Sequence, residues 1–518
     1  MCAQGPLART AARGGLTLAG CGARIRAEMS VVPLEIGAGS AAARAGGKLR
    51  WRELYSEAEL YKAAVRLYTK PLFAWRKALS TSTDSRNLYD FARDGLRRLE
   101  GIHRALSEQE FHFRPGLALH RNFNGKKRTI YIYPWEERLV DLLLYRLLCS
   151  RLHHWFSPHA YAYRWRGFGV DRCQRRIAAR LKSAAGPVYV LKRDIAEYFP
   201  SVDHEILLEQ LAGIVDPGDS LYSLLRERVR FAFMEEGAQR RAARGIPFGT
   251  AIACLFANVH LTGLDRRVAG IPGVTYFRYA DDVLALSEHR GAAQEAAAVL
   301  ETGIRALNLR SKLSHEWNLM FAARPIGAAD FSWAGRFRHL GLEFRAGGPT
   351  GLSRDKFRKL CNLFRFAFRR QRAKFGRTKD PLKRAQLAVE IARKTVSDGV
   401  RNVAILDYYL KHVEDEEQLR RLDRWLAEEA LALAFGRHRR GNFRKLPYAR
   451  LREMGLPSLV HRRRLIEHGR VESPFFIWKT NQREKSSRGM AARRRSGPAG
   501  PAAAAFSPCP AAAVEKAS

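Results

Sequence analysis

Residues 276–286 read Tyr276-Phe277-Arg278-Tyr279-Ala280-Asp281-Asp282-Val283-Leu284-Ala285-Leu286, and this stretch decides the fold of the 518-residue chain. The residues on either side of the acid pair are β-branched, aromatic or apolar, so the pattern predicts two strands joined by a turn that carries the acids. An Asp-Asp pair is expected about once by chance in a chain of this length, usually in a solvated loop. The pair therefore needs a second acid in a matching context before it indicates a metal site.

Asp194 supplies that second acid. Residues 186–203 have the pattern of a buried strand that ends at Asp194 and is followed by a turn and a helix. Two-metal phosphoryl transfer requires carboxylates from separate strands, because they hold two Mg²⁺ ions about 4 Å apart. One ion activates the attacking hydroxyl and the other neutralises the leaving pyrophosphate. Asp194 could instead cap the following helix, but Ser201 or Asp203 is better placed for that role.

From about Arg121 to Phe344 the chain resembles the reverse transcriptases of bacterial mobile and domesticated elements. Five or six motifs occur in the family's order: a basic hairpin with its Asn124-Gly125 turn at 121–138, a Ser-Tyr-Gly-Phe-Arg-like element at 156–167, the Asp194 strand, the segment 245–265, the Asp281–Asp282 hairpin, and a last palm segment and primer grip at 307–316 and 339–344. The resemblance implies an α+β right-hand polymerase, with fingers and palm built from an antiparallel sheet plus helices, and a helical thumb.

Within these motifs the chain departs from intron-encoded and retron enzymes. Those enzymes usually have glutamine where this chain has Phe248 and serine where it has Ala253, which alters template and nucleotide contacts. The phrase at 256–261 resembles enzymes of diversity-generating retroelements and phage-defence polymerases. The family's lysine after the acid pair, a candidate general acid, matches Lys312 if a one-residue gap is assumed. His315 is the alternative, and it would make turnover more pH-dependent between about 6 and 7.

The resemblance implies roles for individual residues, and each role competes with a plainer interpretation. Phe199 is either core or the ring that excludes a ribose 2′-hydroxyl. Lys126, Lys127 and Arg128 either form a solvated turn or include one or two residues that reach the triphosphate. Gly245 and Gly249 would let the backbone approach the nucleic acid closely. The implied catalytic residues are Asp194, Asp281, Asp282 and Lys312, the implied metal site is Asp194, Ile195, Asp281 and Asp282, and the implied nucleotide contacts are Lys127, Arg128, Phe199 and Gly249.

The composition independently indicates a nucleic-acid partner. Lys plus Arg number 91 against 51 Asp plus Glu, which gives a net charge of +40 and a pI of about 10.6. A membrane partner is not expected, because the sequence has no apolar run of spanning length and no clean amphipathic anchor. Arg outweighs Lys, which favours bidentate phosphate contact, although a GC-rich genome would also enrich Arg. The expected partners are an RNA template, a DNA or RNA primer and dNTPs.

A basic helical region is expected after the palm. Residues 354–374 place Phe357, Leu360, Phe364 and Phe368 on one helical face and most cations on the others. The basic side of this helix either contacts the phosphates of the template and primer duplex or is merely exposed to solvent. Residues 419–426 and 443–456 resemble the maturase-like region of intron-encoded proteins, which implies a dedicated noncoding RNA as a further partner.

The domain organisation follows from these motifs and from two low-complexity ends. We expect a disordered leader at 1–47, a helical region at 48–118, fingers and palm at 119–346, a basic helical thumb and maturase-like region at 347–470, and a largely disordered tail at 471–518. The seven cysteines contain no CxxC pair, so neither a zinc site nor a disulfide is predicted, and the chain suits a reducing cytoplasm.

The expected reaction is RNA-directed DNA synthesis. A 3′-hydroxyl would attack the α-phosphate of a dNTP while two Mg²⁺ ions, or Mn²⁺ as a substitute, are held by the acids. Two alternatives stay open: an untemplated or protein-primed DNA polymerase in phage defence, and a non-catalytic RNA-binding maturase-type protein. The three intact acids argue against the second alternative, because a binding module has no use for repulsive carboxylates.

Overall fold

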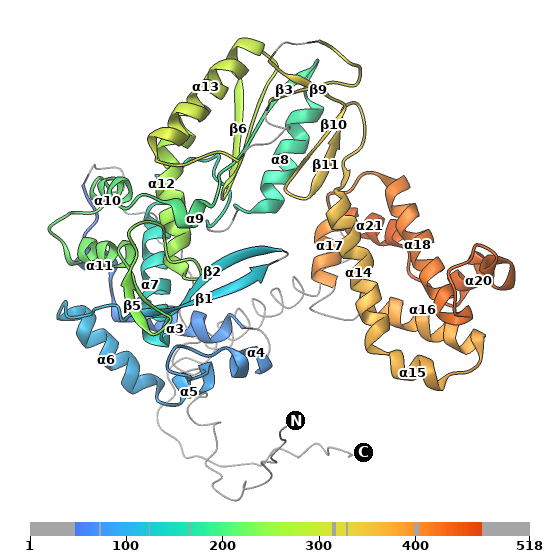
Figure 1. Cartoon of the computed structure of the whole chain (residues 1–518), viewed down its shortest axis with the longest axis horizontal. Helices are drawn as coiled ribbons and strands as arrows, with labels where there is room; N and C mark the ends of the chain where they lie inside the picture. The colour runs from blue at the N-terminus through green and yellow to red at the C-terminus, as the bar shows by residue number, and fades with distance from the viewer. Residues whose placement is uncertain are drawn as a thin grey trace, which may run out of the picture. The chain divides into compact units, whose positions relative to one another are not determined.

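The computed structural model describes residues 47–71, 74–123, 125–164, 167–312, 318–327, 330–397 and 403–468. Asn124, His315, the expected leader up to residue 46 and the expected tail lie outside the described residues. The described elements combine helices and sheets and confirm the predicted α+β class (Figure 1). We use the names fingers, palm and thumb below for three regions of the structure; the fingers combine segments from before and after the first palm strand.

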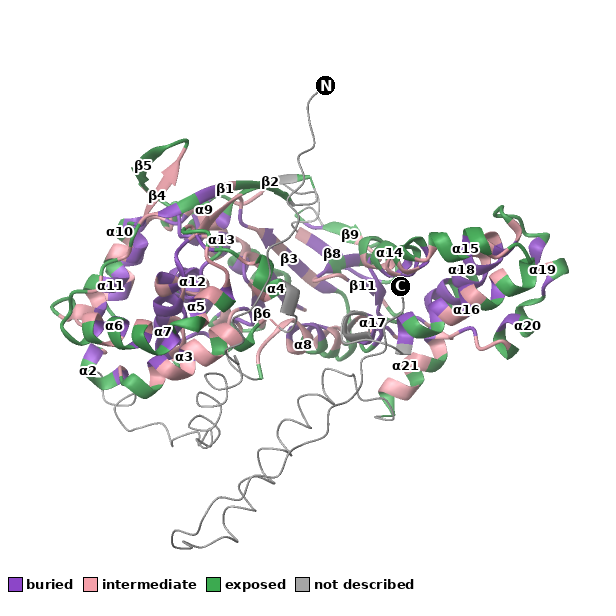
Figure 2. Ribbon diagram, turned by 90° about the horizontal axis from the view of Figure 1, so that it is seen from below, coloured by how far each residue is buried: buried purple, intermediate pink, exposed green. Residues whose placement is uncertain are grey.

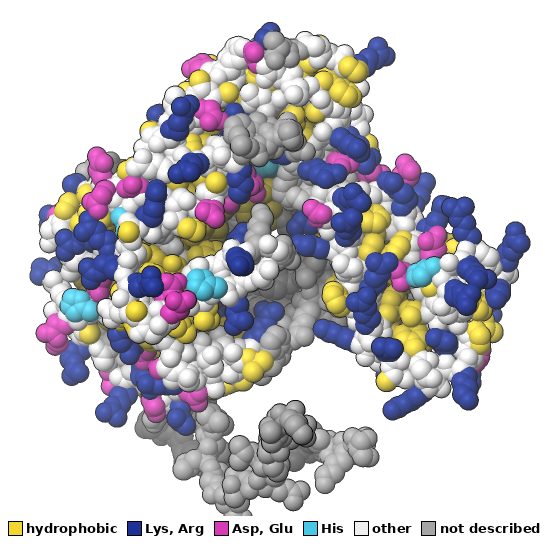
Figure 3. Space-filling model, viewed as in Figure 1, with side chains coloured by type: hydrophobic (Ala, Val, Ile, Leu, Met, Phe, Trp, Pro, Cys, Tyr) yellow, Lys and Arg dark blue, Asp and Glu magenta, His cyan; other side chains and the backbone are white. Residues whose placement is uncertain are grey.

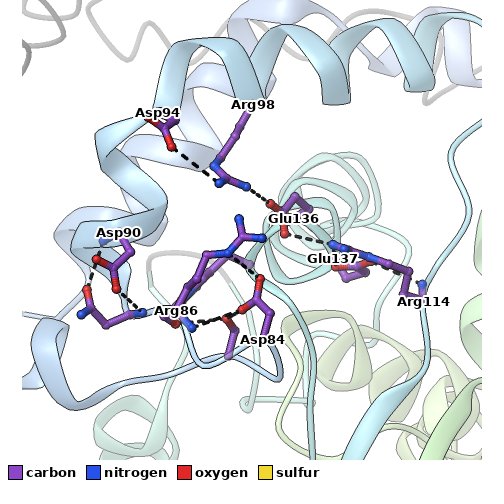
Figure 4. Close-up of polar contacts among 11 residues, drawn as sticks. Asp84, Arg86, Asp90, Asp94, Arg98, Arg114, Glu136 and Glu137 are labelled. Carbon is purple, nitrogen blue, oxygen red and sulfur yellow. Dashed lines mark hydrogen bonds and ion pairs between the residues drawn. The ribbon is translucent and has the colours of Figure 1, made fainter.

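The region that precedes the fingers is helical. It contains α2 (Trp51–Leu54), α3 (Glu57–Thr69), α4 (Ala74–Leu79), α5 (Leu88–Arg93) and α6 (Gly95–Ser107). Figure 4 shows how this region is tied to the start of α7 (Trp135–Arg151). Arg98 on α6 bonds Glu136 at 2.8 Å, and Arg114 bonds the same carboxylate at 3.0 Å as well as Glu137. Acids in the first turn of a helix also complement its dipole, so these contacts stabilise the entry to α7.

The fingers contain a sheet with the strand order β2-β1-β4-β5. Its strands are β1 (Gly116–Phe123), β2 (Lys126–Ile132), β4 (Ala232–Glu235) and β5 (Ala238–Arg241), and the β1–β2 pair forms the basic hairpin expected from the sequence. The backbone N–H of Tyr131 on β2 donates to the carbonyl of Phe248 at 2.9 Å. This bond attaches the hairpin to the loop that precedes α12 (Ala251–Ala269).

The palm sheet has the order β6-β7-β3-β8-β9. Its strands are β3 (Val188–Asp194), β6 (Val274–Tyr279), β7 (Asp282–Ser287), β8 (Asn318–Phe321) and β9 (Ser332–Ala334). The β6–β7, β7–β3 and β3–β8 pairs are antiparallel, as predicted. The β8–β9 pair is parallel, and it is an exception at the edge of the predicted antiparallel sheet. A parallel pair forms there because the chain crosses over between the two strands instead of turning back in a hairpin.

Both faces of the palm sheet are covered. Alternate residues of β3 point to opposite faces: Leu191 and Ile195 join the core that contains α12 and α13 (Arg290–Ala306), whereas Val188 and Val190 join the core beneath α8 (Val170–Lys182). In Figure 2 the central strands and α12 appear among the buried elements. A sheet packed on both sides fixes the ends of β3 and β7, where the acids lie.

Short helices follow the Asp194 strand: α9 (Tyr198–Ser201), α10 (His204–Ala212) and α11 (Ser220–Val229). The N-cap of α10 is Asp203, whose carboxylate accepts from the N–H groups of Glu205 at 3.0 Å and Ile206 at 3.2 Å. The alternative interpretation of Asp194 as the cap of this helix is therefore wrong.

After the palm, β10 (Arg336–His339), β11 (Leu342–Arg345) and β12 (Gly351–Leu352) form a small antiparallel sheet. The thumb follows as α14 (Arg354–Arg370), α15 (Arg372–Arg377), α16 (Pro381–Ser397), α17 (Val403–Leu410), α18 (Glu416–Phe435), α19 (Asn442–Lys445), α20 (Tyr448–Glu453) and α21 (Leu459–Glu467). Leu360, Phe364 and Phe368 of α14 are buried and Phe357 packs against them, which confirms the predicted apolar face. In the described part of the chain, no helix combines the length and the apolar character needed to cross a membrane.

Candidate active site

The acids predicted to act together lie at one end of two neighbouring strands. Asp194 at the end of β3 is directly opposite Asp282 at the start of β7. Asp281 occupies the turn between β6 and β7, and its carbonyl accepts from the N–H of Ile195 at 3.4 Å. Ala280, the other residue of the turn, has a φ of 59°, in the left-handed region that non-glycine residues seldom adopt. The register therefore brings three carboxylates from two segments to one place.

The surroundings of Asp281 and Asp282 make both carboxyl groups harder to ionise. Burial raises the pKa of Asp281, and the charge of Asp194 adds to that effect. Burial, together with the charges of Asp281 and Asp194, raises the pKa of Asp282 to about 6. Carboxylates that are harder to ionise in this way gain from a cation close by. Oxygen ligands of this type are the ones that Mg²⁺ prefers, so the donor set fits the expected ions.

Lys312 reaches the same site. Its Nζ lies 2.5 Å from Oδ2 of Asp194, and its backbone N–H donates to the Asp194 carbonyl at 2.8 Å. The N–H of Ala196 donates to the carbonyl of Arg310 at 2.8 Å, so residues 310–312 run beside 194–196. This backbone pairing holds the lysine next to the acid despite the one-residue gap assumed in the motif. His315, the alternative to Lys312, lies outside the described residues.

The expected metal ligands do not form a ready-made cage. Among the described residues, no three Asp, Glu, His or Cys side chains are grouped closely enough to hold an ion as they stand. Asp194 is instead paired with Lys312. The side chain of Ile195 is buried and carries no ligand atom, so only its backbone carbonyl can serve as a ligand. Metal binding by these residues stays a prediction.

Aromatic rings line the site beside the acids. The ring of Phe199 meets Phe248 edge to face at 5.2 Å between centroids and Tyr163 at 6.3 Å. Phe248, which replaces the glutamine of intron-type enzymes, thus packs on the predicted steric gate. Tyr163 and Glu197 adopt left-handed φ values of 56° and 45°. Such backbone conformations cluster at functional sites, because the surrounding structure must impose them.

The two candidate phosphate contacts of the fingers hairpin differ in position. The guanidinium of Arg128 lies 5.8 Å from the ring centroid of Phe248, and its charge acts on Asp281. Lys127 precedes it on β2, and adjacent strand residues point to opposite faces. The structure therefore brings Arg128 to the site and leaves Lys127 exposed, with no contact to the site residues in the described part. The side chain of Lys126 lies outside the described residues.

Gly245 and Gly249 are required by contacts within the protein. A Cβ at Gly249 would lie 2.7 Å from Cγ2 of Ile130 on β2, and a Cβ at Gly245 would lie 2.8 Å from the Pro200 carbonyl oxygen. Both glycines also have positive φ values, 112° and 89°. The close approach expected from the sequence is thus made to the fingers strand and to α9. A contact between Gly249 and a nucleotide remains a prediction.

One group of residues at the site was not predicted from the sequence. Arg278, Asp265 and Asn258 are 1%, 0% and 0% exposed and bond one another directly behind the acid turn. The available signal was a single arginine inside an otherwise apolar strand. Its partners on α12 are distant in sequence, so the pattern alone did not reveal the network.

A comparison with protein families finds a match over the part of the chain that contains these residues. Residues 74–316 match a family model described as reverse transcriptase (RNA-dependent DNA polymerase). The matched range includes Asp194, the Asp281–Asp282 turn and Lys312. Residues 74–316 are therefore similar to a reverse transcriptase domain.

One curated relative has low sequence identity to this chain. The uncharacterized 91 kDa protein in cob intron of Schizosaccharomyces pombe is 24% identical over 175 residues, which are 33% of this chain and 21% of that protein. The chain thus spans about a fifth of the length of this curated relative.

Two solved structures align at low similarity. Apo telomerase from Candida tropicalis, truncated from the C-terminal domain, is 9% identical with a TM-score of 0.36, covering 52% of this chain and 62% of that chain. Telomerase from Candida albicans in complex with a TWJ fragment of telomeric RNA is 9% identical with a TM-score of 0.38, covering 70% and 68%.

Proposed function

We propose that this protein is an RNA-directed DNA polymerase that extends a 3′-hydroxyl with dNTPs by two-metal phosphoryl transfer. The observation that carries the proposal is the register of β3 and β7, which sets Asp194 opposite Asp282 with Asp281 in the adjoining turn. These acids lie inside the segment that matches the reverse transcriptase family. A partly buried cluster of carboxylates has a clear use in binding cations and is costly to keep otherwise.

In this proposal each group of residues has a distinct task. Asp194, Asp281 and Asp282, with the carbonyl of Ile195, would hold two Mg²⁺ ions, for which Mn²⁺ can substitute. The ions supply charge neutralisation at the attacking and leaving oxygens. Arg128 is placed to contact the triphosphate from the fingers. Lys312 is placed to give a proton to the leaving pyrophosphate once the ions release it from Asp194.

The proposal is tested by incorporation of labelled dNTPs by the purified full chain with Mg²⁺. Three substrates are compared: a primed RNA template, a primed DNA template and no template. Products that depend on the RNA template and disappear in the Asp281→Asn variant support the proposal. Equal products without a template would replace it by the untemplated alternative. Nucleic-acid binding without any Asp281-dependent product would indicate a binding protein.

Phe199 is proposed to select the sugar of the nucleotide. Its ring, held by Phe248 and Tyr163, would occupy the space beside the ribose 2′ position. We expect Phe199→Val to raise the relative kcat/KM for rNTPs by about 10²-fold, the discrimination that steric exclusion of one hydroxyl can supply. The measurement compares single-nucleotide insertion of dCTP and CTP on one primed template.

A neighbouring aromatic provides the control for this test. Tyr198 is buried, and its hydroxyl donates to the Ala257 carbonyl at 2.6 Å, away from the proposed sugar site. Tyr198→Phe should keep the sugar preference of the unmodified protein. An unchanged preference in Phe199→Val as well would remove the assigned role.

A dedicated noncoding RNA is proposed as a further partner of the thumb. Figure 3 shows Lys and Arg side chains gathered over the thumb helices. The segment that follows α18 and includes α19, which we call the thumb-tip loop (residues 436–445), carries Arg437, Arg439, Arg440 and Arg444. Within the described residues, none of these four arginines has an ion-pair partner. The loop is held in shape by Asn442, which is 5% exposed and donates to the Arg437 carbonyl at 2.8 Å.

The length of α18 separates the thumb-tip loop from the small sheet that contains β11. Asp415, at the start of α18, bonds Arg345 of β11 at 2.7 Å. The 20 residues of α18 then extend about 30 Å before the loop begins. Phosphates that the loop contacts would therefore lie about the length of α18 from Asp415, which suits an RNA longer than the primed end of a template.

We expect the triple variant Arg439→Gln, Arg440→Gln and Arg444→Gln to weaken binding of a long stem–loop RNA while a short primed template binds as before. For every arginine–phosphate bond that is removed, the slope of log affinity against log salt should fall by about 0.9. A matched double variant, Arg420→Gln with Arg450→Gln, removes arginines that are already paired with Glu416 and Glu453 and should change little. Equal losses for both RNAs would contradict the assignment.

We further propose that the chain belongs to a mobile or domesticated bacterial element. The motif order resembles bacterial enzymes, and the relative in Schizosaccharomyces pombe is described as a protein in an intron. The sequence around the gene tests this proposal: an intron core, a variable-repeat pair or a defence island would each identify a different programme, and a housekeeping locus would contradict it.

A further inference from the structure

The side chain of Arg278 donates a hydrogen bond to the backbone of the acid turn, by which we mean Ala280 and Asp281. Its Nη1 donates to the carbonyl of Ala280 at 3.1 Å, and Ala280 is the residue immediately before Asp281. The backbone of Arg278 is fixed as well, because its N–H donates to the His159 carbonyl and its carbonyl accepts from Tyr161. The side chain is 1% exposed, so it cannot contact a substrate directly. Any effect on the reaction must pass through the turn.

The guanidinium is locked by two residues of α12. Asp265 accepts from Nε at 2.7 Å and from Nη2 at 2.6 Å, which is the bidentate geometry that a planar guanidinium favours. Asn258 accepts from Nη1 at 3.2 Å. The hydroxyl of Tyr276 also donates to Asp265, at 2.9 Å. Because all three guanidinium nitrogens are bonded to protein acceptors, the group has a single orientation.

The same network reaches the nucleotide side of the site. The amide of Asn258 donates to the carbonyl of Ala162 at 2.9 Å, next to Tyr163, whose ring contacts Phe199. The turn that carries Asp281 and the segment that supports the predicted sugar gate are therefore both attached to α12. A buried ion pair contributes little net stability compared with apolar residues of similar volume. The free-energy cost of burying the Arg278–Asp265 pair is understandable if the pair fixes the geometry of the acid turn.

We infer that Arg278, oriented by Asp265 and Asn258, is a positioning residue that holds the Ala280–Asp281 turn in the conformation that binds the metal ions. This inference rests on the proposed function, since it assigns to the turn the task of holding cations. The left-handed conformation of Ala280, with φ of 59°, needs such a support, because an unsupported alanine favours negative φ. Removing the support releases Asp281 without removing its carboxylate.

The test is Arg278→Lys in the full chain, which keeps the charge beside Asp265 but loses the planar fork. Two quantities are measured: Mn²⁺ affinity from the electron paramagnetic resonance signal of free Mn²⁺, and kcat and KM for dNTP insertion. We expect Mn²⁺ affinity and kcat each to fall by about 10- to 100-fold, as for other residues that orient metal ligands, with the KM for dNTP nearly unchanged. Wild-type Mn²⁺ affinity in the folded variant would overturn the inference.

Arg228→Lys is the matched control. Arg228 is equally buried, at 1% exposed, and is also bidentate to an aspartate, Asp141, but it has no bond to the acid turn. It should lose stability without losing Mn²⁺ affinity. If Arg278→Lys does not fold, the double variant Arg278→Met with Asp265→Leu removes both buried charges, and the same loss of Mn²⁺ affinity is expected from it. Because Mn²⁺ binding requires no template, a failed synthesis assay with intact Mn²⁺ effects would count against the proposed function alone.

Discussion

Replacing Asp281 by Asn is expected to reduce DNA synthesis by about 10³-fold or more while affinity for a primed template stays within about twofold. Asparagine keeps the shape of the side chain but removes the negative charge that faces the expected ions. Asp281 is the residue of the turn, and Asp194 and Asp282 flank it across β3 and β7. Loss of one charge from this small cluster changes the catalytic geometry without touching the basic surfaces that bind nucleic acid. Single-turnover insertion and fluorescence anisotropy measure the two quantities.

Asp203 provides the control for this substitution. It follows the same strand as Asp194, but its carboxylate caps α10 and accepts from Asn308 at 2.9 Å. Asn is as good an N-cap as Asp, so Asp203→Asn should synthesise DNA at nearly the rate of the unmodified protein. Substantial synthesis by Asp281→Asn, or an equal loss in Asp203→Asn, would refute the assignment of the acid turn.

The largest loss of stability is expected from Asp141→Leu. Asp141 on α7 and Arg228 on α11 are each 1% exposed and joined by bonds of 2.8 and 2.5 Å, and the guanidinium lies 3.7 Å from the ring centroid of Tyr133. Removing the carboxylate leaves a buried, unpaired cation, which costs about 3–5 kcal/mol of the free energy of unfolding. The change is measured from the midpoint and slope of urea unfolding, followed by circular dichroism.

Two further variants separate the charge from the loss of packing. Adding Arg228→Met to Asp141→Leu removes the stranded charge and should restore most of the stability. Glu205→Gln breaks the exposed pair of Glu205 with Arg230, whose side chains are 76% and 45% exposed, and should cost less than about 1 kcal/mol. If the double variant is no more stable than Asp141→Leu, the cost comes from the poor fit of the larger leucine side chain and not from the unpaired arginine.

Several features of the site followed from local sequence patterns. The β-branched, aromatic and apolar residues on either side of Asp281 and Asp282 predicted a hairpin, and β6 and β7 form it. The helical spacing from Phe357 to Phe368 predicted the buried face of α14. Asp203 was recognised as a better cap than Asp194. These features depend on periods of two or 3.6 residues and on capping chemistry, which neighbouring residues settle among themselves.

Other features needed the arrangement of distant segments. From the sequence, Lys127 and Arg128 were equally good candidates to contact the triphosphate. Adjacent residues of β2 point to opposite faces, and only Arg128 points to the site. Gly249 was expected to approach nucleic acid, but its missing Cβ makes room for Ile130. The edge pair β8–β9 is parallel because a crossover connects it, which no period within the strands encodes.

The sequence by itself determined that this chain carries the acids, the strands and the motif order of a reverse transcriptase, because those are properties of short stretches and their sequence order. Only the tertiary structure decided that Asp194 stands opposite Asp282, that Lys312 reaches Asp194, and that Arg278 supports the turn from α12. The physical reason is that strand register and buried ion pairs are set by side chains far apart in sequence, packing together around one core.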